Sequence, residues 1–96
     1  MDIFVIAMGY YLNGQYMGAS LAHEAFGKFH RFNSIEICET KLDELFEKGV
    51  PFDPEKNMEY HFFTTKHNRR ILTVIGSPYG GNAIEKYNYN CTDVVD

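Results

Sequence analysis

The sequence predicts an α+β domain: a small antiparallel sheet, built from two hairpins and one or two further strands, with two short helices. Three observations support this class. An apolar run ends at Asn13-Gly14, a second pair of apolar runs flanks His67-Asn68, and an amphipathic segment begins after Thr40. Apolar runs that meet at such turns are typical of hairpins. A ferredoxin-like strand order is the candidate topology, since it places helices on one face of an antiparallel sheet.

The first hairpin is predicted over residues 3–18. Residues 3–12 are mostly apolar, and Asn13-Gly14 supplies the two residues of a tight turn. Because both faces of the first strand are apolar through residue 8, we expect it to lie inside the sheet. A two-residue turn gives three predicted pairs: Leu12 with Gln15, Tyr11 with Tyr16, and Tyr10 with Met17.

Two helices are expected between the hairpins. The first has Ser20 as its N-cap and apolar side chains at helical spacing as far as Lys28, with a bent strand as the alternative. The second has Thr40 as its N-cap and ends at Gly49, a residue suited to a left-handed cap. Between them, alternating isoleucines over residues 34–39 predict a short half-buried strand.

The second hairpin is predicted from the apolar runs Met58–Lys66 and Arg70–Gly76. Large apolar side chains fall on both of its faces, so we expect it to be covered on both sides or to lie at a subunit contact. Residues 83–90 fit either a helix or a strand, and residues 92–96 are expected to fray. A symmetric turn gives four predicted pairs: Phe62 with Thr73, Tyr60 with Ile75, Phe63 with Leu72, and His61 with Val74.

Composition predicts one compact domain over residues 1–96, with 45% hydrophobic residues and a formal charge of −4. An acidic chain is not suited to general binding of nucleic-acid phosphates, which requires a basic surface. The first apolar run follows Asp2 and is too short to span a bilayer, so we expect a cytoplasmic protein that does not bind membranes. In that compartment Cys38 and Cys91 stay as thiols, and a disulfide between them is the alternative.

The catalytic and metal-binding patterns are incomplete. His23-Glu24 has the beginning of a zinc-protease motif, but the second histidine would fall at position 27, which is Gly27. Cys38 would need a base such as His61 beside it and a lowered pKa to act as a nucleophile, and packing as a small hydrophobic residue is the simpler interpretation. We therefore expect no enzymatic activity, no metal and no cofactor.

The loop from Gly76 to Asn82 offers one alternative ligand site. If residues 83–87 form a helix, its backbone N–H groups could receive a phosphate. The eight residues from Ile75 to Asn82 resemble the phosphate loop of flavodoxin-like flavin reductases, where the loop follows the first strand of a much longer α/β domain. That resemblance implies a nucleotide or flavin ligand, and a tight turn is the simpler interpretation. The residues that would form this site are Ser77, Gly80, Gly81 and Asn82.

Charge and aromatic content together predict a protein-binding surface. Eight of the 13 acidic residues lie within residues 36–59, and a negative face could steer the protein toward a basic partner. A solvated helix face is the alternative for these acids. Interface energy concentrates in aromatic anchors. The predicted contact residues are Asp43, Glu44 and Glu47 for steering and Tyr10, Tyr11, Tyr16 and Tyr79 as anchors.

These observations favour recognition over catalysis. We predict a small protein-binding module, an inhibitor or adaptor of the kind that phages and mobile elements encode, which acts stoichiometrically by covering a basic surface of its partner. Two alternatives remain: a nucleotide- or flavin-binding protein that uses the Gly76–Asn82 loop, and a structural homo-oligomer joined through the second hairpin.

Overall fold

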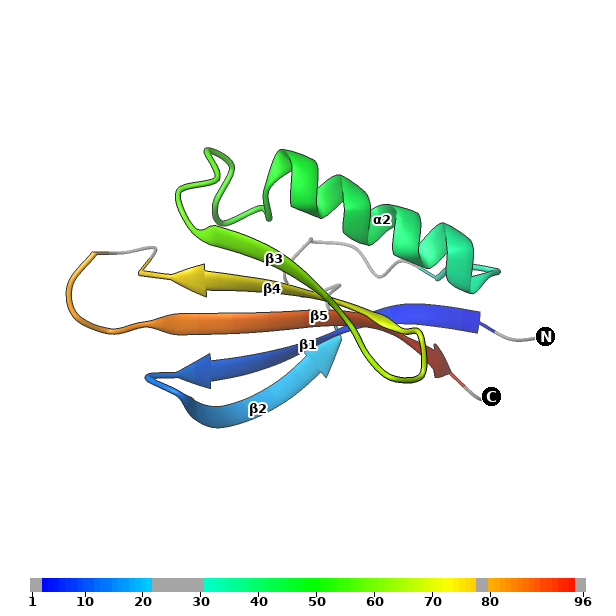
Figure 1. Ribbon diagram of the computed structural model, residues 1–96, viewed down its shortest axis with the longest axis horizontal. Coiled ribbons are helices and arrows are strands. Elements are labelled where there is room, and N and C mark those ends of the chain that lie inside the picture. Colours follow the sequence, from blue (N-terminus) through cyan, green and yellow to red (C-terminus); the bar gives the residue numbers. More distant parts are fainter. Residues whose placement is uncertain (1–2, 22–30, 78–79, 95–96) are drawn as a thin grey trace.

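The computed structural model describes residues 3–21, 31–77 and 80–94. They form a five-stranded antiparallel sheet with one α-helix packed on one face (Figure 1), which confirms the α+β class. The strand order across the sheet is β2-β1-β5-β4-β3. The elements are β1 (Ile3–Leu12), β2 (Gln15–Leu21), α2 (Ile35–Lys48), β3 (Glu59–Thr64), β4 (Arg70–Gly76) and β5 (Glu85–Val94).

This strand order differs from the ferredoxin-like candidate. Ferredoxin-like sheets are built from strands joined by helical crossovers, whereas here β1–β2, β3–β4 and β4–β5 are neighbours in both the chain and the sheet. The first and last strands, β1 and β5, pair with each other, and this pairing joins the β1–β2 hairpin to the other three strands in one sheet. The hairpin signals predicted neighbouring strands correctly, but they carried no information on how the two hairpins join.

The β1–β2 hairpin follows the prediction near its turn and departs from it farther away. Asn13 and Gly14 both have positive φ, 49° and 84°, as the predicted turn requires. Beyond the turn, Tyr10 pairs with Gly18 instead of Met17, because a bulge interrupts the register. β1 lies between β2 and β5, which confirms that it is an interior strand. The two pairs beside the turn are as predicted, Leu12 with Gln15 and Tyr11 with Tyr16.

The predicted β3–β4 register is wrong by one residue. Phe62 pairs with Leu72, because the turn enclosed by Thr65 and Arg69 holds three residues, 66–68, instead of two. The Thr65 N–H donates to the Arg69 carbonyl at 2.8 Å to close this loop, and Asn68 takes the positive φ, 63°, that such loops require. Register decides which side chains share a face of the sheet. The observed pairs include Tyr60 with Val74, His61 with Thr73, and Phe63 with Ile71.

α2 begins earlier than predicted, and the strand expected over residues 34–39 is its first turn. The Ser34 hydroxyl is the N-cap and accepts a hydrogen bond from the Ile37 N–H at 3.2 Å. Thr40 lies inside the helix, where its hydroxyl donates to the Glu36 carbonyl at 2.9 Å. The alternating isoleucines match the period-two pattern of a strand, but the residues that face the sheet recur at helical spacing. They are Ile35, Cys38, Leu42 and Leu45.

Gly49 ends α2 as predicted. Its N–H donates to the Leu45 carbonyl at 2.9 Å, and its φ is 87° with ψ at 158°. A Cβ added to Gly49 would lie 2.5 Å from the Asp53 carbonyl oxygen. The close approach and the positive φ both require glycine at this position.

The buried core lies between α2 and the sheet, and a disulfide crosses it. Cys38 of α2 is bonded to Cys91 of β5, with their Cα atoms 6.2 Å apart. The expectation that both remain thiols is therefore wrong: helical spacing turns Cys38 inward, and the β1–β5 pairing places Cys91 on the same side of the sheet. The core residues are Ile6, Cys38, Leu42, Leu45, Val50, Met58, Leu72, Val74, Tyr89 and Cys91.

Three further predictions concern the segments between and after these elements. Residues 83–90 contain the start of β5, which settles the choice between helix and strand in favour of strand, and the predicted fraying is wrong for residues 92–94 because they pair with β1. Ser20 lies in β2 instead of capping a helix. The remainder of that predicted helix, residues 22–30, lies outside the described residues. Across the described ranges, no helix is both long and apolar enough to cross a bilayer.

Candidate protein-binding face

The face of the sheet turned away from α2 carries exposed side chains over β3, β4 and β5, whereas Val5 of β1, which points to the same side, is only 1% exposed. Side chains alternate between the two faces of a strand, and no described element packs over this side (Figure 1). We call it the open face. Its side chains form three rows that run across the strands. The first holds Glu59, Ile75, Lys86, Tyr11 and Tyr16; the second His61, Thr73, Asn88, Gly9 and Ala19; the third Phe63, Ile71, Asn90 and Ala7.

A shallow groove of about 450 Å³ crosses the part of the open face formed by β3, β4 and β5. In its floor, the Thr73 hydroxyl donates to the Asn88 side-chain oxygen at 2.8 Å. Phe63 stands at its β3 end with 57% of its surface exposed. Binding sites combine apolar surface with polar groups, and in this groove three apolar side chains lie among five polar or charged ones. The groove is lined by Glu59, His61, Phe63, Ile71, Thr73, Ile75, Lys86 and Asn88.

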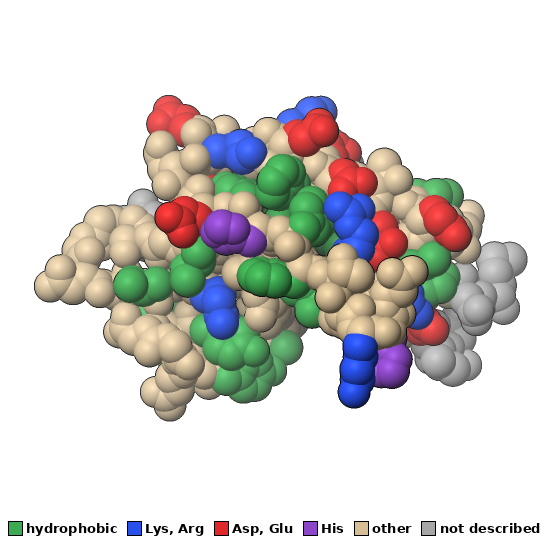
Figure 2. All heavy atoms as spheres, viewed as in Figure 1, with side chains coloured by type: hydrophobic (Ala, Val, Ile, Leu, Met, Phe, Trp, Pro, Cys, Tyr) green, Lys and Arg blue, Asp and Glu red, His purple; other side chains and the backbone are tan. Residues whose placement is uncertain are grey.

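Figure 2 shows how charge is distributed around this face. Hydrophobic side chains lie across it with lysine and histidine side chains among them, whereas most acidic side chains in this view lie toward the side of α2. The surface is therefore mixed in chemistry, with exposed apolar groups beside scattered charges. Such composition is common in the contact surfaces of soluble proteins.

Tyr11 and Tyr16, two of the predicted anchors, form a pair on the open face. Their ring centroids are 5.3 Å apart, and the Lys86 ammonium lies 4.4 Å from the centroid of the Tyr11 ring. A Cβ on Gly9 would lie 3.8 and 3.9 Å from carbons of the two rings. The rings thus lie over the glycine and continue the surface of the groove toward β2.

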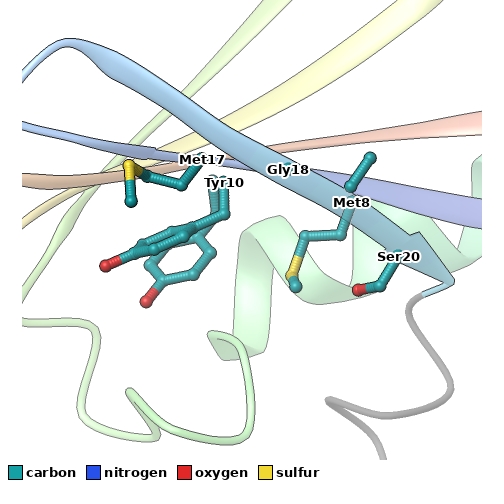
Figure 3. Close-up of a pocket in the computed structure, with 7 residues that line it drawn as sticks. Met8, Tyr10, Met17, Gly18 and Ser20 are labelled. Atoms are coloured by element: carbon teal, nitrogen blue, oxygen red, sulfur yellow. The ribbon is translucent and has the colours of Figure 1, made fainter.

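Tyr10 lies on the opposite face, because neighbouring strand residues point to opposite sides. Its ring stacks on Tyr87 at 5.1 Å between centroids. Both hydroxyls donate to the same oxygen of Glu85, at 2.8 and 3.0 Å. Tyr10 also lines an apolar pocket of about 380 Å³ between β1 and β2 (Figure 3). It does not join the other anchors, and Tyr79 lies outside the described residues.

Asp43, the first predicted steering residue, forms an ion pair within the protein. Its carboxylate accepts an ion-paired contact of 2.6 Å from the Arg70 guanidinium. That guanidinium also lies 4.1 Å from the centroid of the Phe62 ring. The hydrogen bond to Asp43 raises the pKa of Arg70 above its usual value. Asp43 therefore attaches α2 to the start of β4, and part of its charge is compensated.

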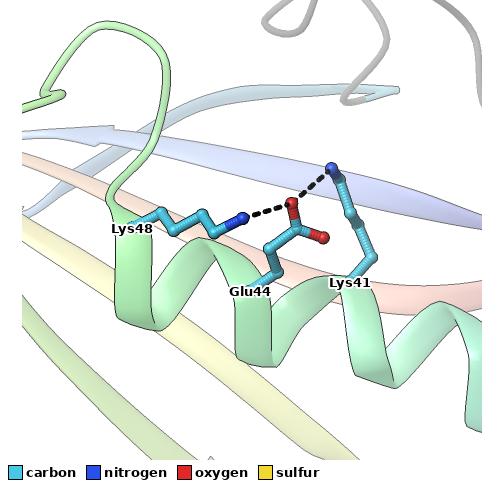
Figure 4. Close-up of polar contacts among 3 residues, drawn as sticks. All are labelled: Lys41, Glu44 and Lys48. Atoms are coloured by element: carbon cyan, nitrogen blue, oxygen red, sulfur yellow. Dashed lines mark ion pairs between the residues drawn. The ribbon is translucent and has the colours of Figure 1, made fainter.

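The other two steering residues differ from each other. The Glu44 carboxylate lies 3.6 Å from the ammonium groups of both Lys41 and Lys48 (Figure 4). Glu47 is exposed and forms no ion pair with any described residue. Exposed pairs on a helix are screened by solvent and salt, but they cancel much of the field that steering requires. Glu47 is thus the least compensated of the three.

The loop between β4 and β5 does not have the geometry of the alternative ligand site. The Ser77 hydroxyl donates to the Ala83 carbonyl at 2.6 Å, and the Gly80 N–H donates to the Ser77 carbonyl at 3.1 Å. Gly80 and Gly81 both have positive φ, 77° and 87°. The loop leads into β5, so the helix N-terminus that a phosphate would require is not present there. Asn82 is exposed in the same turn.

The sequence did not predict the groove on the open face, although its signal was present. His61 and Phe63 alternate with helix-side residues along β3, and Asn88 and Asn90 do the same along β5. Recognising the groove required the β4–β5 pairing, which depends on residues 85–94 being a strand. The sequence pattern of residues 83–90 fits both a helix and a strand.

Within the described ranges, no three His, Cys, Asp or Glu side chains are placed to hold a metal ion, and the His23-Glu24 pair lies outside those ranges. Searches against protein-family models, curated proteins and solved structures find no match to this chain.

Proposed function

We propose that this chain is a protein-binding module that acts stoichiometrically, as an inhibitor or adaptor, and that its open face is the contact surface. The observation that carries the proposal is Phe63, which is 57% exposed beside a groove of mixed apolar and polar lining, on a face that no described element covers. Large apolar side chains exposed together on a rigid sheet are typical of contact surfaces. Tyr11 and Tyr16 extend this surface across the sheet.

The acidic residues take a secondary role in this proposal. Asp43 and Glu44 are compensated by Arg70 and by two lysines, whereas Glu47 is not. A net charge of −4 still favours approach to a basic partner, because long-range attraction depends on the summed charge. Contact energy comes from the open face, and charge influences the rate of association.

The location of the protein is a separate proposal. A buried disulfide between Cys38 and Cys91 is typical of an oxidising compartment, so we propose such a compartment in place of the cytoplasm expected from the sequence. Trapping free thiols in denaturant at the moment of cell lysis tests this choice, because both cysteines are buried in the folded protein. Full labelling of both cysteines by the trapping reagent would contradict it.

Affinity capture tests the proposed function. Tagged wild-type protein is expected to retain a partner in stoichiometric amount from a lysate of its own source, at both low and high salt. Phe63→Gln should lose that partner, because it removes the exposed apolar group without adding charge. Retention of the same partner by Phe63→Gln at wild-type level would show that binding does not use the open face.

A further inference from the structure

We propose that a second copy of this chain binds to the groove over β3, β4 and β5 and forms a two-fold symmetric dimer. The inference rests on the proposed function, in which the open face binds protein. Its basis is the first row of the open face, where Glu59, Ile75 and Lys86 lie directly across from one another on the three strands. Negative, apolar and positive groups therefore occupy successive positions at the strand spacing of about 4.8 Å.

This order of charges is self-complementary. When two such faces meet with the two-fold axis along β4, each residue of β3 lies opposite a residue of β5 in the second copy. Glu59 then faces Lys86 of the second copy, and Ile75 faces its own equivalent. A two-fold axis repeats every contact, so one interface would contain two ion pairs that flank an apolar centre. An axis along β5 would instead bring the two Lys86 ammonium groups together, which costs energy.

The second and third rows are compatible with the same arrangement. His61 would face Asn88 of the second copy, whose side-chain NH₂ donates to no described residue. Phe63 and Ile71 are paired neighbours that place apolar surface beside the axis. The Glu59 side chain is 78% exposed, and its carboxylate lies 3.7 Å from the His61 Nε2. Lys86 is half-buried, with its ammonium 4.4 Å from the centroid of the Tyr11 ring.

The size of the overlap sets the expected strength. Only three strands of each sheet face each other, which places the contact at the small end of specific interfaces. We therefore expect a dissociation constant of roughly 1 µM or weaker. β1 and β2 extend beyond the overlap, so Tyr11 and Tyr16 stay accessible beside the edge of the dimer.

Sedimentation equilibrium of charge-swapped variants tests the dimer. The wild type should show a concentration-dependent change from monomer to dimer. Glu59→Lys and Lys86→Glu should each raise the dissociation constant at least about tenfold, because each places like charges opposite each other. An equal mixture of the two variants should restore dimers, since the cations of one variant then face the anions of the other. Restoration in the mixture also shows that both variants are folded.

Two control variants carry the same changes in net charge at positions outside the groove. Glu55→Lys in the α2–β3 loop and Lys66→Glu in the β3–β4 loop, both at exposed positions outside the groove, should leave the dissociation constant near the wild-type value. A wild type that stays monomeric at every concentration, or a mixture that associates no better than its components, would overturn the dimer. A monomeric wild type that retains a different protein, with that protein lost in Phe63→Gln, would overturn the proposed dimer. The proposed function of the open face would not be contradicted by that result.

Discussion

The Tyr60 hydroxyl donates a 2.8 Å hydrogen bond to the carboxylate of Asp53, a buried residue of the loop between α2 and β3. The same carboxylate accepts the backbone N–H groups of Asn57 and Met58 at 2.8 and 3.0 Å. These bonds fix the chain just before β3 begins at Glu59. The open face therefore depends on this loop, because β3 carries one side of the groove.

Replacing Asp53 by asparagine should lower the free energy of unfolding by about 2 kcal/mol, because an NH₂ group then faces a buried hydrogen-bond donor. Urea denaturation at neutral pH measures the change. Glu55→Gln, in the same loop but exposed, is the matched control and should leave the stability unchanged. An equal loss in both variants would contradict the role given to Asp53.

Asp53 should also make the free energy of unfolding depend on pH. Burial raises its pKa, but the hydrogen bonds from Met58, Tyr60 and Asn57 and the charge of Lys56 together bring the pKa below its ordinary value. A carboxyl whose pKa is lower in the folded state stabilises the fold above the unfolded pKa and loses that effect as pH falls through the folded pKa. The difference between wild type and Asp53→Asn should therefore shrink in acid. A difference that is constant with pH would contradict this account.

Removing the disulfide should cost about 4 kcal/mol of stability, the chain-entropy value for a loop of 53 residues. Replacing both Cys38 and Cys91 by alanine avoids leaving a lone thiol in the core. Denaturation of this double variant, beside wild type with and without reductant, measures the cost. The double variant and reduced wild type should agree, and a double variant as stable as oxidised wild type would contradict the prediction.

Gly49→Ala should destabilise the protein more than Gly14→Ala. Both glycines have φ near 85°, so both substitutions introduce backbone strain of about 1–3 kcal/mol. Only at Gly49 would the new methyl group also meet a backbone oxygen, that of Asp53, at 2.5 Å. Thermal unfolding of the two variants measures both losses of stability, and their difference gives the cost of the contact with the Asp53 oxygen apart from the backbone strain. Equal losses would show that the chain near Asp53 relaxes freely.

The sequence predicted the parts of this fold that depend on local signals. Asn13-Gly14 identified the first turn, and Gly49 identified the end of α2. The predicted start of α2 is wrong because Ile35 and Ile37 alternate as in a strand, although only Ile35 packs against the core. Local patterns of six residues fit both periodicities, and the position of the sheet decides between them.

The candidate site was less predictable, because it depends on pairing between distant segments. Glu59, Ile75 and Lys86 form one row only through the β3–β4 and β4–β5 registers. Residue type alone predicts the anchors, but the alternation of side chains along β1 places Tyr10 and Tyr11 on opposite faces of the sheet. The disulfide likewise follows from contact between α2 and β5, which no local pattern predicts.

The central claim is that the open face binds protein, and a matched pair of substitutions tests it most directly. Phe63 and Ile37 are almost equally exposed, at 57% and 55%, but Phe63 lies on the open face and Ile37 on α2. Binding of the captured partner should be titrated against wild type, Phe63→Gln and Ile37→Gln. We expect Phe63→Gln to raise the dissociation constant at least about tenfold, as loss of an interface anchor does, and Ile37→Gln to leave it unchanged. An equal or larger loss from Ile37→Gln would contradict the claim.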